Sequence, residues 1–181
     1  SKDAADGKPE VRIFAERGPY AALHGGSRGV FTHRSSSRGT VQDLRLDSYI
    51  DGPQQATFSN FPRQILKHEG THLLVCLSFG ARPVPTWFNE GLATFFEEWD
   101  LRQTVEDNLR ERHLRSRRVR EVVAMARNDE LIGFTDWLAD LERRGWDADG
   151  FGPITLRNYA IAETVMDYLV RAEDGQRVFR H

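Results

Sequence analysis

A single cysteine, Cys76, stands among the 181 residues, so no disulfide can form within the chain. No apolar run approaches the roughly 18 residues that a membrane-spanning helix needs, so no membrane span is expected. Neither sign of charge is in large excess, because 25 lysines and arginines and 27 aspartates and glutamates give a formal net charge of −2. This balance gives no general reason to expect a nucleic-acid partner. The length and composition suit a globular protein with a hydrophobic core.

The length and the composition of the first residues predict one domain with a short leader. Residues 1–10 are small, charged or turn-forming, so we expect a disordered leader there, followed by a single domain over residues 11–181. The first residue is serine, as it would be after removal of a signal peptide. The location stays open on this basis, with a secreted or periplasmic protein favoured over a cytoplasmic one.

The sequence of the first third of the domain predicts a small mixed or antiparallel sheet. Three short segments rich in strand-forming residues are the predicted strands, Val11–Phe14, Gly29–Thr32 and Val41–Leu46. Between the first two lies a glycine-rich loop that contains His24, and Ser35–Gly39 is a predicted turn. His24 and His33 are candidate site residues by type, but isolated histidines of this kind are usually solvated, and we expect them to be so.

Two histidines stand four residues apart in a segment that predicts a helix over residues 60–79. Asn60 is a candidate N-cap, and Gly80 stands just past the end. Side chains at i and i+4 project from the same face of a helix, one turn apart. The nitrogens of His68 and His72 can therefore meet one tetrahedral metal ion, and these residues are the first two predicted ligands.

Glu69 follows the first of these histidines directly, about 100° around the helix from it. That position can reach a water molecule bound to the metal but is poorly placed for binding the metal itself. Zinc lowers the pKa of bound water towards ~7, and a neighbouring carboxylate can then accept a proton as the hydroxide attacks a carbonyl carbon. Glu69 is therefore the candidate general base for hydrolysis of a peptide bond.

A third ligand must come from outside this helix. A metzincin would carry glycine and histidine where this chain has Val75 and Ser78, so that class is excluded. Further along, two prolines interrupt the chain, Thr86 can cap, and a second helix is predicted from Trp87 onward. Glu90 lies in the first turn of that helix and is the natural third ligand.

Gly91 follows Glu90 and weakens a helix by roughly 0.5–1 kcal/mol relative to alanine. A glycine here makes sense if the second helix must approach the first closely around a metal ion. Should Glu90 not bind the metal, Glu97 and Glu98 on the same helix are the alternative carboxylates. Cys76 is a soft ligand by type, but its apolar neighbours predict a buried hydrophobic residue.

The two motifs, H-E-G-T-H and W-F-N-E-G-L-A, resemble those of the gluzincin metallopeptidases, the thermolysin-like group of the peptidase-MA clan. The likeness covers residues 58–100 most strongly. It is nearer to uncharacterised bacterial families of that clan than to the membrane-alanyl aminopeptidases, since 17 residues separate His72 from Glu90 where eighteen are expected in the latter.

The resemblance implies an α+β, thermolysin-like zincin catalytic domain, in which a small N-terminal sheet packs on the H-E-x-x-H helix and a helical part follows. It implies one Zn²⁺ per chain, held by His68, His72 and Glu90, with Glu69 as general base. The implied partner is a peptide or protein substrate, which in the resembling families pairs with an edge strand of the sheet.

The last clear helix is predicted over Thr155–Arg171 and carries Tyr159 in its first turn. Resembling gluzincins place a tyrosine or a histidine opposite the zinc, where it stabilises the developing oxyanion, and this implies a catalytic role for Tyr159. The alternative is that Tyr159 packs against neighbouring helices, as tyrosines of amphipathic helices usually do.

An arginine-rich stretch, Glu106–Arg120, precedes this part of the chain. Its apolar positions continue a helical stripe as far as Ala126, acidic residues alternate with the basic ones, and no aromatic residues are interleaved for base stacking. A solvated helix face is therefore favoured over a nucleic-acid site. A shorter helix is predicted over Leu131–Leu141, followed by a loop over residues 145–153.

Two functions follow from these patterns. The first is zinc-dependent hydrolysis of peptide bonds by a zinc-activated water, with the choice between endopeptidase and exopeptidase open. The second is a zinc-stabilised peptide-binding or interaction domain without activity, a pseudo-peptidase. Glu69 favours the enzyme, because a structural zinc site needs no base and usually closes with a fourth protein ligand.

Overall fold

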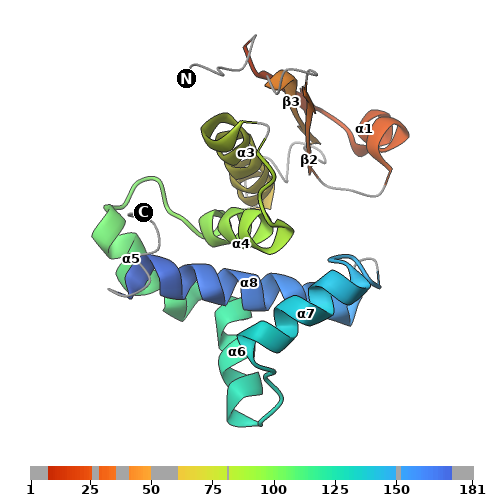
Figure 1. Ribbon diagram of the computed structural model, residues 1–181. Coiled ribbons are helices and arrows are strands. Elements are labelled where there is room, and N and C mark those ends of the chain that lie inside the picture. The colour runs from red at the N-terminus through yellow and green to blue at the C-terminus, as the bar shows by residue number, and fades with distance from the viewer. Residues whose placement is uncertain are drawn as a thin grey trace. The chain divides into compact units, whose positions relative to one another are not determined.

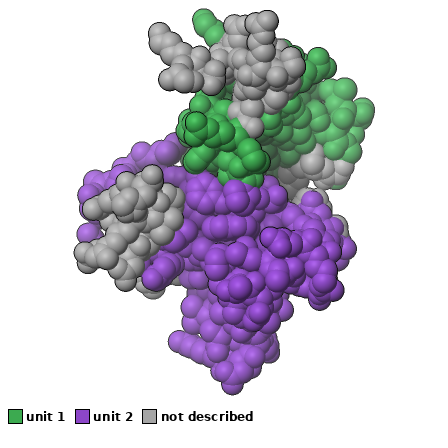
Figure 2. Space-filling view, in the orientation of Figure 1, with its two compact units in different colours: residues 1–84 green, residues 85–181 purple. Residues whose placement is uncertain are grey.

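A computed structural model describes residues 8–25, 29–35, 41–49, 61–80, 82–149 and 152–172. These residues form a mixed α+β protein with a three-stranded sheet and seven helices, which confirms the expected fold class at this level. The chain divides into two compact units, residues 1–84 and residues 85–181 (Figure 2). Within the described residues the first strand begins at Glu10, and residues 1–7 of the expected leader lie outside the described part. The leader and the single domain over residues 11–181 stay predictions.

The sheet of the first unit is mixed (Figure 1). Its central strand β3 (Val41–Tyr49) pairs in parallel with β1 (Glu10–Phe14) and antiparallel with β2 (Gly29–Ser35). The prediction of a small mixed or antiparallel sheet is thus confirmed in its mixed form, although β3 continues three residues past its predicted end. The predicted turn after β2 lies mostly outside the described residues.

Helix α1 (Arg17–His24) occupies the segment for which we predicted a loop. Its Tyr20 is fully buried, with its ring 5.6 Å from that of Phe14 and 4.9 Å from that of Tyr49. Gly25 ends the helix with φ 64°, and its N–H donates to the carbonyl of Ala21. The loop prediction is wrong because aromatic packing on the sheet, rather than local sequence, stabilises this helix.

The expectation of a solvated His24 is also wrong. Its Nε2 atom lies 2.7 Å from the Oδ2 atom of Asp47, a β3 residue that is 1% exposed. Arg12 on β1 donates two further hydrogen bonds to the same carboxylate. Burial alone would raise the pKa of Asp47, but the hydrogen bonds from Arg12 and His24 outweigh it and hold the pKa below its ordinary value of 3.8. His33 is exposed on β2, as expected.

Replacing Asp47 with asparagine is expected to lower the free energy of unfolding by about 2 kcal/mol at pH 7, because charged hydrogen bonds to Arg12 and His24 are lost. An aspartate whose pKa is lower in the folded than in the unfolded protein stabilises the fold at pH values above its ordinary pKa. This contribution is lost as the pH falls through the lowered pKa of the folded state. Urea unfolding should therefore show the difference narrowing below about pH 4. The exposed Asp43→Asn change is the control and should stay within about 0.5 kcal/mol of the parent. A variant at Asp47 as stable as that control would contradict the prediction.

Helix α3 (Phe61–Phe79) packs on β2 and β3 of the first unit. The buried residues Leu44 and Cys76 form its contact with the sheet, and Phe31 and Leu73 pack against them. Burial raises the pKa of the Cys76 thiol, and the prediction of a buried hydrophobic residue is confirmed. Gly80 ends the helix with φ 63°, as predicted, whereas the N-cap candidate Asn60 lies outside the described residues.

The second unit is helical, and α8 runs through it against α4 and α6 (Figure 1). Its helices are α4 (Thr86–Glu97), α5 (Val105–Arg115), α6 (Arg117–Arg127), α7 (Phe134–Arg144) and α8 (Pro153–Arg171). A core cluster joins α6, α7 and α8 through the buried residues Val122, Trp137, Ala160, Ile161 and Ala162. Among the described helices, none is both long enough and apolar enough to span a membrane.

Several predicted boundaries in this unit are wrong. Thr86 is the first residue of α4, and Pro85 takes the N-cap position without a side-chain cap, so Thr86 does not cap the helix. The arginine-rich stripe is divided into two helices by Ser116, whose hydroxyl accepts a hydrogen bond from the N–H of Val119. Helix α7 lies three residues later than predicted, and α8 begins two residues earlier, at Pro153, where proline suits the first turn.

Candidate metal centre

The middle of α3 carries His68, Glu69 and His72. The two imidazole rings lie one turn apart, with centroids 4.7 Å from each other and planes at 86°. His72 is 8% exposed and Glu69 is 9% exposed, while His68 is partly buried. Polar groups in such positions are costly unless they have partners, and two neighbouring imidazoles are common metal ligands.

Glu90 lies one turn into α4 and is partly buried. Among the described residues, His68, His72 and Glu90 form a group that could hold a metal ion, since each offers one ligand atom and these atoms lie within 4.8 Å of one another. Imidazole nitrogen and carboxylate oxygen are ordinary zinc ligands, with bonds of about 2.0–2.2 Å. The chemistry of the donor set is therefore compatible with zinc.

Close packing between α4 and α8 fixes the position of the turn that carries Glu90. A Cβ atom on Gly91 would lie 2.8 Å from the carbonyl oxygen of Ala162 and 3.0 Å from Cγ of Met166. The fully buried Thr94 donates from its hydroxyl to the carbonyl of Glu90 at 2.8 Å. Within its own unit, Gly91 thus makes room for the backbone of α8, and the reason expected for this glycine stays a prediction.

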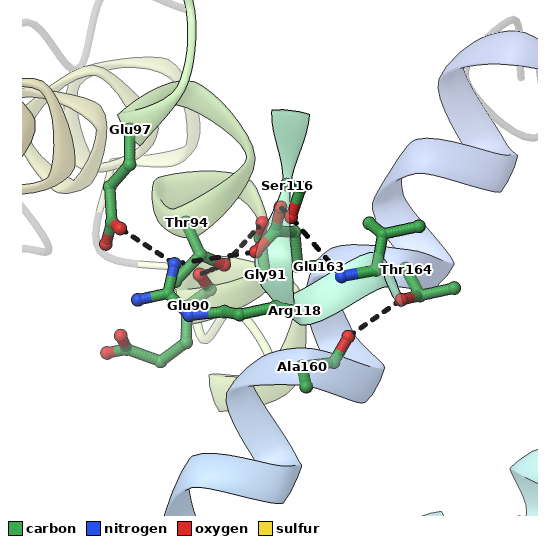
Figure 3. A network of polar contacts seen from close by, with 10 residues as sticks. Glu90, Gly91, Thr94, Glu97, Ser116, Arg118, Ala160, Glu163 and Thr164 are labelled. Atoms are coloured by element: carbon green, nitrogen blue, oxygen red, sulfur yellow. Dashed lines mark hydrogen bonds and ion pairs between the residues drawn. The ribbon is translucent and has the colours of Figure 1, made fainter. Parts of the chain in front are cut away.

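A buried polar network joins the same two helices to α6 (Figure 3). Glu163 on α8 is 0% exposed and accepts a hydrogen bond from the Ser116 hydroxyl at 2.6 Å. The Arg118 guanidinium lies 2.8 Å from the carboxylate of Glu97 on α4 and 3.5 Å from that of Glu163. Paired buried charges of this kind fix helix positions, because removal of one partner leaves the other uncompensated. Glu97, an alternative third ligand, is thus paired with an arginine.

Tyr159 lies on α8, one turn before the contact with Gly91. Its ring packs edge-on against that of Trp146, with centroids 5.1 Å apart, and the Trp146 carbonyl accepts a hydrogen bond from Asn158 at 3.0 Å. Burial raises the pKa of Tyr159 well above its ordinary value, and the negative charge of Glu90 raises it further. The hydroxyl therefore stays protonated at neutral pH and lies in the electrostatic field of the Glu90 carboxylate.

Two residues near these groups escaped the sequence analysis. Asp147 follows Trp146, and its pKa is raised by burial and by the charge of Glu90. Gly29 at the start of β2 lies against Glu69, because a Cβ atom there would be 2.9 Å from Oε1 of that side chain. An isolated aspartate in a loop and a glycine in a strand carry no sequence signal that identifies their neighbours.

Comparisons with family models, with curated proteins and with solved structures found no match.

Proposed function

We propose that this chain is a zinc-dependent peptidase of the gluzincin type with a thermolysin-like catalytic fold. The observation that carries the proposal is the ligand group of His68, His72 and Glu90, whose ligand atoms lie within 4.8 Å of one another. Glu69 on the same helix turn as the histidines adds a carboxylate that is not needed to bind a metal. Three ligands with a fourth position open are typical of catalytic zinc sites.

Bound zinc would supply a Lewis acid that polarises a carbonyl group and acidifies water. Glu69 would accept the proton of the attacking water and later donate it to the leaving amine. Tyr159, protonated and partly buried beside Glu90, would donate a hydrogen bond to the substrate carbonyl oxygen as that oxygen gains negative charge. The substrate class is a peptide or protein, and the reaction is hydrolysis of an amide bond.

The purified protein is expected to bind about one zinc ion per chain, and Glu90→Ala should weaken that binding by at least tenfold, because loss of an outer-shell partner alone typically costs about 10–100-fold. Competition with a chromophoric zinc chelator measures the dissociation constant, and elemental analysis after dialysis measures the content. Glu142→Ala, which removes an exposed carboxylate on α7, is the matched control and should bind zinc as the parent does.

The outcomes separate the alternatives. A parent that takes up less than about a tenth of an equivalent of added zinc would overturn the metal site altogether, since structural and catalytic sites both bind stoichiometrically. If Glu90→Ala binds zinc as tightly as the parent does, the third ligand is Glu98 or Glu97 instead of Glu90. Stoichiometric zinc without hydrolysis of any peptide in a diverse library would favour the zinc-stabilised interaction domain.

A further inference from the structure

Gly29 is the first residue of β2 and lies against α3 at the position of Glu69. A Cβ atom on Gly29 would lie 2.7 Å from Cγ and 2.9 Å from Oε1 of Glu69, and 2.5 Å from Cγ2 of Ile65. Carbon atoms in van der Waals contact are about 3.5–4.0 Å apart, so no side chain fits at this position without displacement. The backbone of Gly29 is not in the left-handed region, so the glycine contributes space rather than conformational freedom.

The strand cannot easily move away to relieve such a clash. Gly29 pairs with Ser48 on β3, the central strand of the sheet. Two residues further along β2, Phe31 packs against the core formed by Leu44 and Cys76. Because residues i and i+2 of a strand face the same side, a methyl group at position 29 would be directed towards α3, as Phe31 is.

Of the two side chains that a methyl group would meet, Glu69 is the one able to yield. Ile65 is branched at Cβ and lies on a helix, where one χ1 rotamer is strongly preferred, so its Cγ2 is held by the helix backbone. Glu69 has three rotatable side-chain bonds, and rotation about the first two moves its carboxylate. A side chain at position 29 would therefore displace the Glu69 carboxylate by rotation, and a small shift between β2 and α3 would relieve the remaining contact with Ile65.

We propose that Gly29 is a positioning residue for Glu69, in that the space left by its missing side chain holds the carboxylate where it can accept a proton. This inference rests on the proposed function, in which Glu69 is the general base. A general base must lie within about 2.6–3.2 Å of the atom that gives up the proton. A misplacement of about 1 Å can lower a rate about 10²-fold, so Gly29 carries a large effect without touching the substrate.

Crystal structures of the parent and of Gly29→Ala test the geometry directly. The Glu69 carboxylate is expected to move by about 1 Å or more relative to the α3 backbone, and by more than His68 moves. This readout needs neither turnover nor bound metal. A carboxylate that stays within about 0.5 Å of its parental position, the tolerance of a productive site, would overturn the inference.

Kinetics test the consequence. Gly29→Ala is expected to lower kcat by about 10–10²-fold while KM and zinc content stay near the parental values. Gly18→Ala is the matched control, because it makes the same change in the same unit at a position with no atom within 4 Å, and it should leave kcat unchanged. A kcat for Gly29→Ala within about twofold of that control would overturn the inference.

A double variant separates positioning from damage to the fold. Ile65→Ala removes the Cγ2 atom that lies nearest to the added methyl group and opens space beside Glu69. Gly29→Ala combined with Ile65→Ala is therefore expected to recover part of the lost kcat, although Ile65→Ala alone removes packing from a partly buried position and destabilises the protein. A further fall in kcat would overturn the inference. A parent that hydrolyses no peptide would instead refute the proposed function, and the two crystal structures would still decide the role of Gly29.

Discussion

Replacing Glu69 with glutamine is expected to lower kcat by about 10²–10⁴-fold while the protein keeps about one zinc ion per chain. Glutamine has the shape of glutamate and fills the same space beside Gly29, but its amide cannot accept a proton at neutral pH. Glu69 is not part of the ligand group, so zinc binding should survive the change. The measurements are kcat on a cleaved peptide and zinc content by elemental analysis.

The control is Glu142→Gln, which makes the same substitution at an exposed position of α7 and should leave both quantities at parental values. Equal turnover in the parent and in Glu69→Gln would exclude Glu69 as the base. Loss of zinc in parallel with loss of turnover would indicate instead that Glu69 contributes to the metal site. The variant is therefore informative about the chemistry only when the zinc content is measured on the same sample.

The helix around the histidines could be predicted because its signals are local. The sequence shows a long amphipathic segment followed by Gly80, which predicts a helix that ends there. In the structure α3 ends at Phe79, and Gly80 has a positive φ. The i, i+4 spacing of His68 and His72 likewise depends only on helix geometry. Features that repeat every turn are visible in one sequence, whatever the rest of the fold does.

Contacts between distant segments could not be predicted in this way. Helix α1 is eight residues long, and its buried Tyr20 packs on Phe14 and Tyr49, which belong to two different strands. Short helices depend on tertiary packing, and no local pattern in the sequence predicts that Tyr20 will pack on these two residues. Arg118 is one of several arginines in a charged stretch, and its partners Glu97 and Glu163 are 21 and 45 residues away in the sequence.

Gly91 illustrates the same limit within the predicted site. Its presence beside Glu90 correctly indicated a close helix approach, but the approaching backbone belongs to Ala162 of α8. A glycine shows that something must come near without showing what comes near. The consequence for the site is that α8, through Ala162 and Tyr159, is the element that packs closely behind the turn carrying Glu90.

Replacing Tyr159 with phenylalanine is expected to lower kcat by about 10²–10³-fold, because removal of one donor to a developing oxyanion typically costs roughly 2.7–4 kcal/mol of transition-state stabilisation. Phenylalanine keeps the ring that packs on Trp146, so the thermal midpoint should change little. Burial and the charge of Glu90 keep the parental hydroxyl protonated throughout the neutral range.

The decisive comparison is with Tyr168→Phe, which removes a hydroxyl from an exposed tyrosine of the same helix. This control should match the parent in kcat, KM and thermal midpoint, because the hydroxyl that it removes is exposed to water in the parent. A tyrosine with a packing role alone would give the opposite pattern at position 159, namely a lowered midpoint with little kinetic change. If Tyr159→Phe stays within about threefold of the parental kcat, the loss is far smaller than an oxyanion donor requires, and Tyr159 belongs to the packing of α8 against Trp146.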